Sequence, residues 1–195
     1  MRILPCGDRA VLLDCDDPIE ARRWHAALRD RAPVLGASSV LLRGRPDELR
    51  SLIGATDLSD VHLPAGREVE IRVAYDGPDL EDVARHCGLR AHEVVARHTA
   101  GTWSVGFAGF APGFAYLTGG DPVLEVPRLA RPRPRVEAGS VGLAGRFSGV
   151  YPRPSPGGWQ VIGHTDARLW DLRRDEPALL QPGDVVRFVD AGAGT

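Results

Sequence analysis

The sequence predicts an α+β fold, with a small N-terminal α/β domain followed by a larger β-barrel domain. Over about the first fifty residues, short apolar runs with strand and helix spacing alternate. The amino-acid composition changes after Gly101. Thirteen of the 23 glycines and eight of the 16 prolines fall between positions 101 and 164, among short apolar runs. Dense turn residues between short strands are typical of a barrel or a sandwich. We expect domains over residues 1–66 and 67–195.

The N-terminal domain reads as two strand–helix units. The expected elements are a strand over Ala10–Leu13, a helix over Pro18–Arg31, a strand over Ser39–Leu42 and a helix over Asp47–Ile53. Asp17 and Pro18 supply the start signal of the first helix, whose apolar stripe runs through positions 21, 24, 27 and 28. This order predicts a split βαβ or ferredoxin-like sandwich. The polar stretch 56–67 is expected to be a linker.

The second domain begins with the alternating strand Glu68–Ala74, followed by two helices. Asp79 is expected to cap the first helix, with Asp82 completing a capping box and Gly88 ending it. The second helix is expected from Ala91 to Thr99. Its charges nearly balance, so two helices covering a sheet are favoured over a DNA-binding helix–turn–helix. Later strands are expected at Trp103–Phe107, Val141–Ala144, Trp159–Ile162 and Val185–Val189.

Composition excludes several classes of function. The net charge of −2 argues against a nucleic-acid binder, and no apolar run approaches the roughly 20 residues needed to cross a membrane. The three widely spaced cysteines do not suggest a disulfide framework or a zinc site, so we expect a cytoplasmic protein. The sequence contains no lysine. This chain therefore cannot carry biotin or PLP on its own lysine, nor form a Walker A loop.

Five segments in order carry a resemblance to a known family. They are Gly109–Leu117, Val126–Arg128, Pro132–Val136, Ala138–Gly145 and Val150–Pro152 with Ser155–Gly163; Gly7–Ala10 and Leu180–Phe188 also fit. The chain resembles the B-type subunit of bacterial 5-oxoprolinase. That family is also labelled allophanate hydrolase subunit 1 and carboxyltransferase domain, subdomains C and D, and it is similar to an inhibitor of a sporulation kinase.

The resemblance implies a cyclophilin-like barrel as the second domain. It also implies a heteromeric hydrolase that opens 5-oxo-L-proline to L-glutamate with ATP and Mg²⁺. This chain would act there with a larger homologous C-type subunit, together with a third, A-type subunit. His164 stands where the family more often has Arg, which puts any anion-binding role of that position in doubt.

Several residues of the matched region suit a small anionic substrate. Positions 101 to 164 contain six arginines but only three acidic residues, Asp121, Glu125 and Glu137, so this region is locally positive. Arginine binds carboxylate and phosphate through its planar fork, and glycines let backbone N–H groups approach an anion. The candidate substrate- or anion-binding residues are Arg128, Arg133, Arg135, Gly139, Ser140, Gly142, Phe114, Tyr116, Trp159 and His164, with Phe110 as a further wall. Surface solvation, barrel turns and plain core are the competing interpretations.

No catalytic residue can be assigned from the sequence. Ser140 lacks the glycine two residues earlier that a nucleophile elbow needs, because Ala138 stands there. The histidines at 86, 92 and 98 recur every six residues, which scatters them around a helix, so no metal site is expected. The scarcity of acids predicts that partner subunits supply much of the chemistry and that the chain is inactive alone.

Two other functions stay open. A regulatory module that inhibits a sensor histidine kinase would also suit a chain with few catalytic groups. A peptide-binding or prolyl-isomerase-like domain is suggested by the barrel alone, and it ranks last because a fold does not imply a function.

Overall fold

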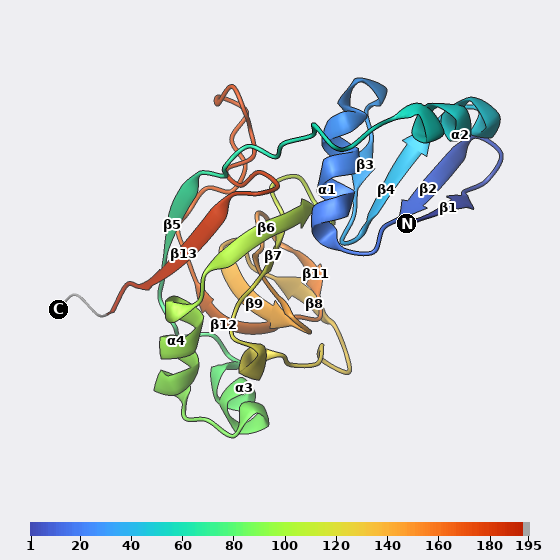
Figure 1. The fold of residues 1–195 in the computed structure, drawn as a ribbon. Coiled ribbons are helices and arrows are strands. Elements are labelled where there is room, and N and C mark those ends of the chain that lie inside the picture. The colour runs from blue at the N-terminus through green and yellow to red at the C-terminus, as the bar shows by residue number, and fades with distance from the viewer. Residues whose placement is uncertain (193–195) are drawn as a thin grey trace. The chain divides into compact units, whose positions relative to one another are not determined.

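The computed structural model describes residues 1–192 and divides the chain into two compact units, Met1–Ala65 and a second unit that begins at Gly66 (Figure 1). The elements of the first unit are β1 (Arg2–Pro5), β2 (Ala10–Asp14), α1 (Pro18–Ala27), the 3-10 turn η1 (Arg29–Arg31), β3 (Val34–Leu35), β4 (Ser39–Arg43) and α2 (Pro46–Ala55). Its antiparallel sheet has the order β1-β2-β4-β3, and α1 packs against β3 and β4 while α2 packs against β2.

Local signals place the start of α1 where it was expected, but α1 ends at Ala27 rather than at Arg31, and η1 follows it. The Asp17 carboxylate accepts a hydrogen bond from the Glu20 backbone N–H, with Pro18 at the first helical position. Ala21 and Trp24 form the buried stripe of α1. The ferredoxin-like topology is not confirmed, because the order is β-β-α-β-β-α rather than β-α-β-β-α-β. The pattern missed β1, which has no buried residue, and β3, which has two residues.

The second unit has more strands than the sequence indicates. Its elements are β5 (Glu68–Val73), α3 (Leu80–Cys87), α4 (Ala91–Ala100), β6 (Trp103–Ala108), β7 (Ala115–Thr118), η2 (Pro122–Leu124), β8 (Arg133–Val136), β9 (Ser140–Ala144), β10 (Phe147–Val150), β11 (Ser155–Gly157), β12 (Gln160–His164) and β13 (Val185–Asp190). Seven strands form one sheet in the order β12-β9-β10-β7-β6-β13-β5. β8 and β11 form a separate hairpin.

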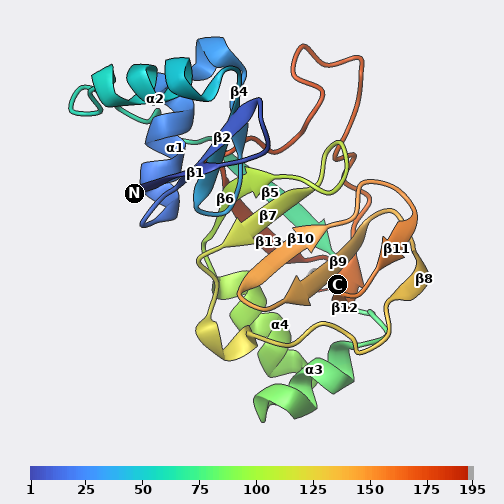
Figure 2. The ribbon, with the colours of Figure 1, turned by 90° about the vertical axis from the view of Figure 1, so that its right-hand side faces the viewer.

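The seven-stranded sheet curls so that its two edge strands, β12 and β5, nearly meet (Figure 2). An antiparallel bridge joins Ala74, just after β5, to His164 at the end of β12, with both backbone hydrogen bonds at 2.8 Å. Helices α3 and α4 pack against each other and against β12 and β13 respectively. The expected barrel is thus confirmed, and its interior is filled by buried apolar side chains such as Val105, Leu117 and Ile162.

The expected capping box at the start of α3 is wrong. The Asp79 side chain makes no hydrogen bond to the helix. Instead, its carboxylate accepts from the Val161 backbone N–H at 2.6 Å and from both terminal nitrogens of Arg133, at 2.8 and 2.6 Å. A buried carboxylate needs partners that satisfy its charge, and the β12 backbone and Arg133 offer more than the helix end does.

Candidate functional site

A small pocket at the surface of the barrel unit gathers several of the predicted site residues. Its cavity volume is about 80 Å³. The lining residues are Phe110, Phe114, Tyr116, Arg128, Tyr151, Gly157, Gly158 and Trp159. They come from the β6–β7 turn, β7, the segment before β8, the end of β10, β11 and the residues that follow it. Phe110, Phe114, Tyr116 and Trp159 were predicted as walls of a pocket and Arg128 as an anion-binding residue, while Tyr151, Gly157 and Gly158 were missed.

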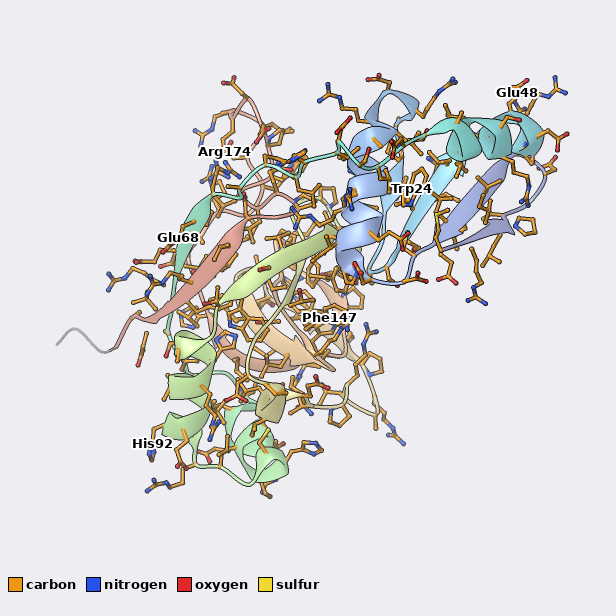
Figure 3. All side chains as sticks on the ribbon, in the orientation of Figure 1. Trp24, Glu48, Glu68, His92, Phe147 and Arg174 are labelled. Carbon is orange, nitrogen blue, oxygen red and sulfur yellow. The ribbon has the colours of Figure 1, made fainter. Side chains whose placement is uncertain are left out.

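Edge-to-face aromatic contacts form the wall of this pocket. Phe114 lies centrally, with ring centroids 5.3 Å from Trp159, 5.5 Å from Tyr151 and 5.1 Å from Tyr116. Such T-shaped pairs add roughly 0.5–1.5 kcal/mol each beyond area burial. Phe107 and Phe147, the latter labelled in Figure 3, extend the cluster behind Tyr116. The wall is thus rigid and mostly apolar.

The aromatic rings leave no room for a side chain at two glycines, Gly149 and Gly157. An added Cβ at Gly149 would lie 3.0 Å from the Trp159 ring and 3.1 Å from the Phe114 ring. At Gly157 it would lie 2.3 Å from the Tyr151 hydroxyl. Side chains at either position would displace the wall, so the glycine-rich character of the region serves ring contact as well as turns.

Phe110 is the unusual member of the lining. Its backbone has φ of +65°, the left-handed region that a bulky side chain rarely adopts. The tight turn around it is closed by hydrogen bonds from Ala111 N–H to Gly109 O and from Phe114 N–H to Ala111 O. Although it stays 57% exposed, its ring makes edge contacts with Phe114 and Tyr151. Strain of this kind clusters at functional sites, and here it holds an aromatic ring at the pocket mouth.

Tyr151 supplies a buried hydroxyl. It is 2% exposed, and burial raises the pKa of its phenol, while a hydrogen bond from the Trp159 backbone and the charge of Arg128 oppose that rise. The phenol therefore stays protonated near neutral pH and can donate a hydrogen bond. Its signal in the sequence was only an aromatic residue within the matched segment Val150–Pro152.

The structure distinguishes the three predicted arginines. Arg133 is bound to the buried Asp79, and the exposed Arg135 pairs with the equally exposed Glu137 at 2.6 Å. Arg128 is exposed and lines the pocket, and it forms no ion pair with any carboxylate in residues 1–192. Of the three, Arg128 alone combines a free guanidinium with a concave apolar wall.

Three further predicted residues lie at the start of the neighbouring strand β9. Gly139 has φ of +81°, and a Cβ there would meet the Thr165 carbonyl at 2.2 Å. Ser140 is buried, and its backbone carbonyl accepts from the Tyr151 N–H. Gly142 faces Trp159, whose Cβ would lie 3.1 Å from an added Cβ. Each therefore supports strand contact behind the pocket wall, and none lines the pocket.

His164 belongs to a different surface. Its Nδ1 lies 2.7 Å from the Asp76 carboxylate, and both side chains are more than half exposed. It lines a second cavity of about 390 Å³ with Glu70, Arg72 and Asp166. The structure does not bring His164 together with the aromatic pocket.

A second histidine, His98, lies inside the barrel unit. The His98 ring is fully buried between the Tyr75 hydroxyl, 2.7 Å from Nδ1, and the Ser148 hydroxyl, 2.9 Å from Nε2. Burial lowers its pKa to about 3. Within residues 1–192, no three His, Cys, Asp or Glu side chains are grouped so that they could hold a metal ion. The helices of the same stretch are all too short or too polar to cross a membrane.

Comparison with known proteins identifies relatives of the whole chain. A family model described as "Carboxyltransferase domain, subdomain C and D" matches residues 1–180. The 5-oxoprolinase B subunit of Escherichia coli O157:H7 is 42% identical over 207 aligned residues, which cover 96% of this chain and 95% of that protein. The 5-oxoprolinase B subunit of Bacillus subtilis (strain 168) is 48% identical over 126 residues, covering 63% of this chain and 52% of that protein.

Solved structures share the fold. The crystal structure of TTHA0988 superposes with a TM-score of 0.81 at 34% identity, covering 94% of this chain but 40% of that one. The protein PH0987 from Pyrococcus horikoshii gives 0.61 at 32% identity, with 97% of both chains covered. Urea carboxylase from Kluyveromyces lactis gives 0.71 at 18% identity, which is a likeness of fold alone. The chain thus spans less than half of TTHA0988. From the family match over residues 1–180 and the near full-length similarity to the E. coli protein, the chain belongs to the carboxyltransferase domain family, subdomains C and D, that includes the B-type subunit of 5-oxoprolinase.

Proposed function

We propose that this chain is the B-type subunit of a multi-protein, ATP-dependent 5-oxoprolinase that converts 5-oxo-L-proline to L-glutamate. The observation that carries the proposal is the 42% identity to the E. coli 5-oxoprolinase B subunit across 95% of that protein's length. The relatives' names give no support to the alternative of a histidine-kinase inhibitor.

The aromatic pocket suits part of such a substrate. A 5-oxoproline molecule has a carboxylate, a small flat lactam ring and an amide carbonyl. Arg128 can pair with the carboxylate, the Phe114 and Trp159 rings offer an apolar wall, and the protonated Tyr151 hydroxyl can donate to an oxygen. In this proposal Arg128, Tyr116, Phe114 and Trp159 are binding residues. Arg133, Gly139, Ser140 and Gly142 stabilise the strands around the pocket, whereas Arg135 and His164 lie outside its lining.

The pocket lacks most of what the reaction requires. No carboxylate of residues 1–192 lines it, although ring opening needs acid–base groups and ATP needs Mg²⁺ ligands. Its volume of about 80 Å³ is also below the roughly 300 Å³ typical of small-molecule sites. We infer that a larger C-type subunit, together with a third, A-type subunit, supplies the ATP and Mg²⁺ sites and that this chain is inactive alone.

We also propose the barrel type, the domain boundary and the cellular location that this family membership implies. The barrel is cyclophilin-like, the boundary between the two domains lies near residue 66, and the complex works in the cytoplasm. Neither biotin nor PLP is attached to this chain, which has no lysine to hold them.

Co-expression with the two companion subunits, the larger homologous one and the third component, tests the proposal. We expect the three proteins to give ATP-dependent release of glutamate from 5-oxoproline, and we expect each omission to abolish it. Full activity of the other two components without this chain would contradict the assignment. Tight binding to a sensor histidine kinase in the absence of the companions would favour the regulatory alternative.

A further inference from the structure

Three exposed apolar side chains of the barrel unit lie on two loops that touch. Phe110 is 57% exposed on the β6–β7 turn, and Trp170 and Leu172 are 39% and 78% exposed on the long loop between β12 and β13. An added Cβ at Gly113 would lie 3.0 Å from both the Trp170 Cβ and the Leu169 carbonyl oxygen, so the turn and the loop are in contact there. Figure 2 shows the turn, yellow-green, beside the base of the orange-red loop. We call Phe110, Trp170 and Leu172 the apolar tip.

The long loop is held in one shape although it has no regular secondary structure. Its base is anchored by the buried Leu169 and Leu180 and by an antiparallel bridge between Trp170 and Ala178. The Asp171 carboxylate ties the turn together, because it accepts from the Arg173 guanidinium at 2.9 Å and from Arg168 at 3.4 Å. Long ordered loops of this kind are usually functional. Arg174, labelled in Figure 3, lies on the same projection.

This shape presents apolar groups to the outside rather than hiding them. Leu172 is the most exposed of the large hydrophobic side chains in residues 1–192, and Phe110 keeps its exposure through a left-handed backbone conformation. The turn and the loop touch and both hold apolar side chains outward, where a partner could bury them as anchors, and such buried anchors carry most of the binding energy of an interface. Preorganisation lowers the entropy lost on binding.

The neighbouring pocket indicates what the partner must bring. Phe110 belongs both to the apolar tip and to the pocket lining, so a partner seated on the tip lies at the pocket mouth. That pocket has an unpaired Arg128 and no carboxylate among residues 1–192. A complementary surface is therefore apolar where it meets the tip and acidic or substrate-bearing where it faces Arg128. The homologous fold of TTHA0988 also continues into further polypeptide, since this chain covers 40% of that one.

We propose that the apolar tip is the docking surface for the larger companion subunit, which thereby covers the mouth of the aromatic pocket and completes its walls. This inference rests on the proposed function, because it takes the companion from the 5-oxoprolinase complex. The active site is then shared, with Arg128 and the rings from this chain and the carboxylates from the companion.

Matched substitutions test the docking surface. Leu172→Ser and Val123→Ser each remove one exposed aliphatic side chain, and Val123 lies on η2, which packs against α3 and α4. We expect Leu172→Ser to weaken the Kd for the purified larger companion at least about tenfold in isothermal titration calorimetry, as a central apolar contact does. Val123→Ser is expected to leave the Kd within about twofold. Equal affinity of Leu172→Ser and the unsubstituted chain would overturn the inference.

A second measurement needs no destabilising change. Because Trp170 is 39% exposed, we expect acrylamide to quench its indole fluorescence in the free chain, and we expect the companion to shield it from quenching. Trp170→Phe keeps an aromatic side chain and should abolish that difference. Unchanged quenching on complex formation would contradict docking at the tip.

The two failures are distinguishable. If the unsubstituted chain does not bind the larger companion at all, the proposed function is wrong. If it binds and the three-component enzyme is active, while Leu172→Ser binds equally well and Trp170 stays accessible, only the docking surface is wrong.

Discussion

Two arginines of the same proline-rich segment, Arg128 and Arg133, have opposite surroundings. Arg133 makes two hydrogen bonds to the Asp79 carboxylate, which is 4% exposed and also binds the Val161 backbone. Arg128 has no carboxylate partner in residues 1–192 and borders an open aromatic pocket. The satisfied arginine joins α3, β8 and β12, whereas the unsatisfied one is available to a ligand. Partner satisfaction, rather than residue type, separates a structural cation from a binding one.

The largest effect on stability is expected from removing the Asp79 carboxylate, the partner of Arg133. Asp79→Ala leaves Arg133 half-buried without its counter-ion and the Val161 N–H without an acceptor, so we expect a loss of about 3 kcal/mol in unfolding free energy. Urea denaturation followed by tryptophan fluorescence measures it. Asp79→Asn keeps an oxygen for Val161 and should cost less. A loss below about 1 kcal/mol for Asp79→Ala would show that the clamp is not structural.

Replacing the unpaired Arg128 should change substrate affinity and not stability. We expect Arg128→Gln to raise KM for 5-oxoproline about 30-fold in the assembled enzyme, because a charge-assisted hydrogen bond contributes roughly 1.5–3 kcal/mol. The unfolding free energy of this exposed position should change by less than about 0.5 kcal/mol. Arg128→Lys should recover part of the affinity, since it restores the charge without the planar fork. An unchanged KM would remove Arg128 from the site.

His98, a buried and fully hydrogen-bonded group, makes the stability of the barrel unit depend on pH. Its pKa is about 3 in the folded chain and about 6.5 when exposed, so between these values only the unfolded form takes up the proton. The contribution of His98 to stability is therefore fully present well above pH 6.5 and is lost as the pH drops, by about 2 kcal/mol between pH 8 and pH 5. His98→Gln should flatten this slope, even though it lowers stability overall.

His92, exposed on the same helix and labelled in Figure 3, offers the matched control. His92→Gln should retain the slope of the unsubstituted chain between pH 8 and pH 5. His25 also has a pKa lowered by burial, but it lies in the first unit, so its contribution stays in both variants. The same slope in His98→Gln would mean that His98 does not cause it.

The smallest effect is expected at Arg135. Its ion pair with Glu137 is exposed on both sides, and such surface pairs contribute about 0–1 kcal/mol. Arg135→Gln should leave KM within about twofold and stability within about 0.5 kcal/mol. A loss of activity comparable to that of Arg128→Gln would place Arg135 in the site and weaken the distinction based on partner satisfaction.

The sequence alone predicted the architecture where the pattern is local. Alternation in Glu68–Val73, the helix signals at Asp17, Pro18 and Gly88, and the density of glycine and proline after position 101 identified an α/β unit followed by a barrel. Ordered motifs predicted the family. Short strands such as β3, β8 and β11 escaped, because two to four residues do not establish a period of two.

Only the tertiary structure decided which predicted residues come together. Asp79 and Val161 are 82 positions apart, so no sequence spacing reveals that Asp79 binds the β12 backbone rather than its own helix. Tyr151 joins Phe114 only when β10 and β7 pair, and His164 is carried to another face by the closure of the barrel. The residue types and their order determined the available chemistry. Long-range strand pairing decided which groups were left with partners, because burial and charge satisfaction depend on neighbours that are distant in the chain.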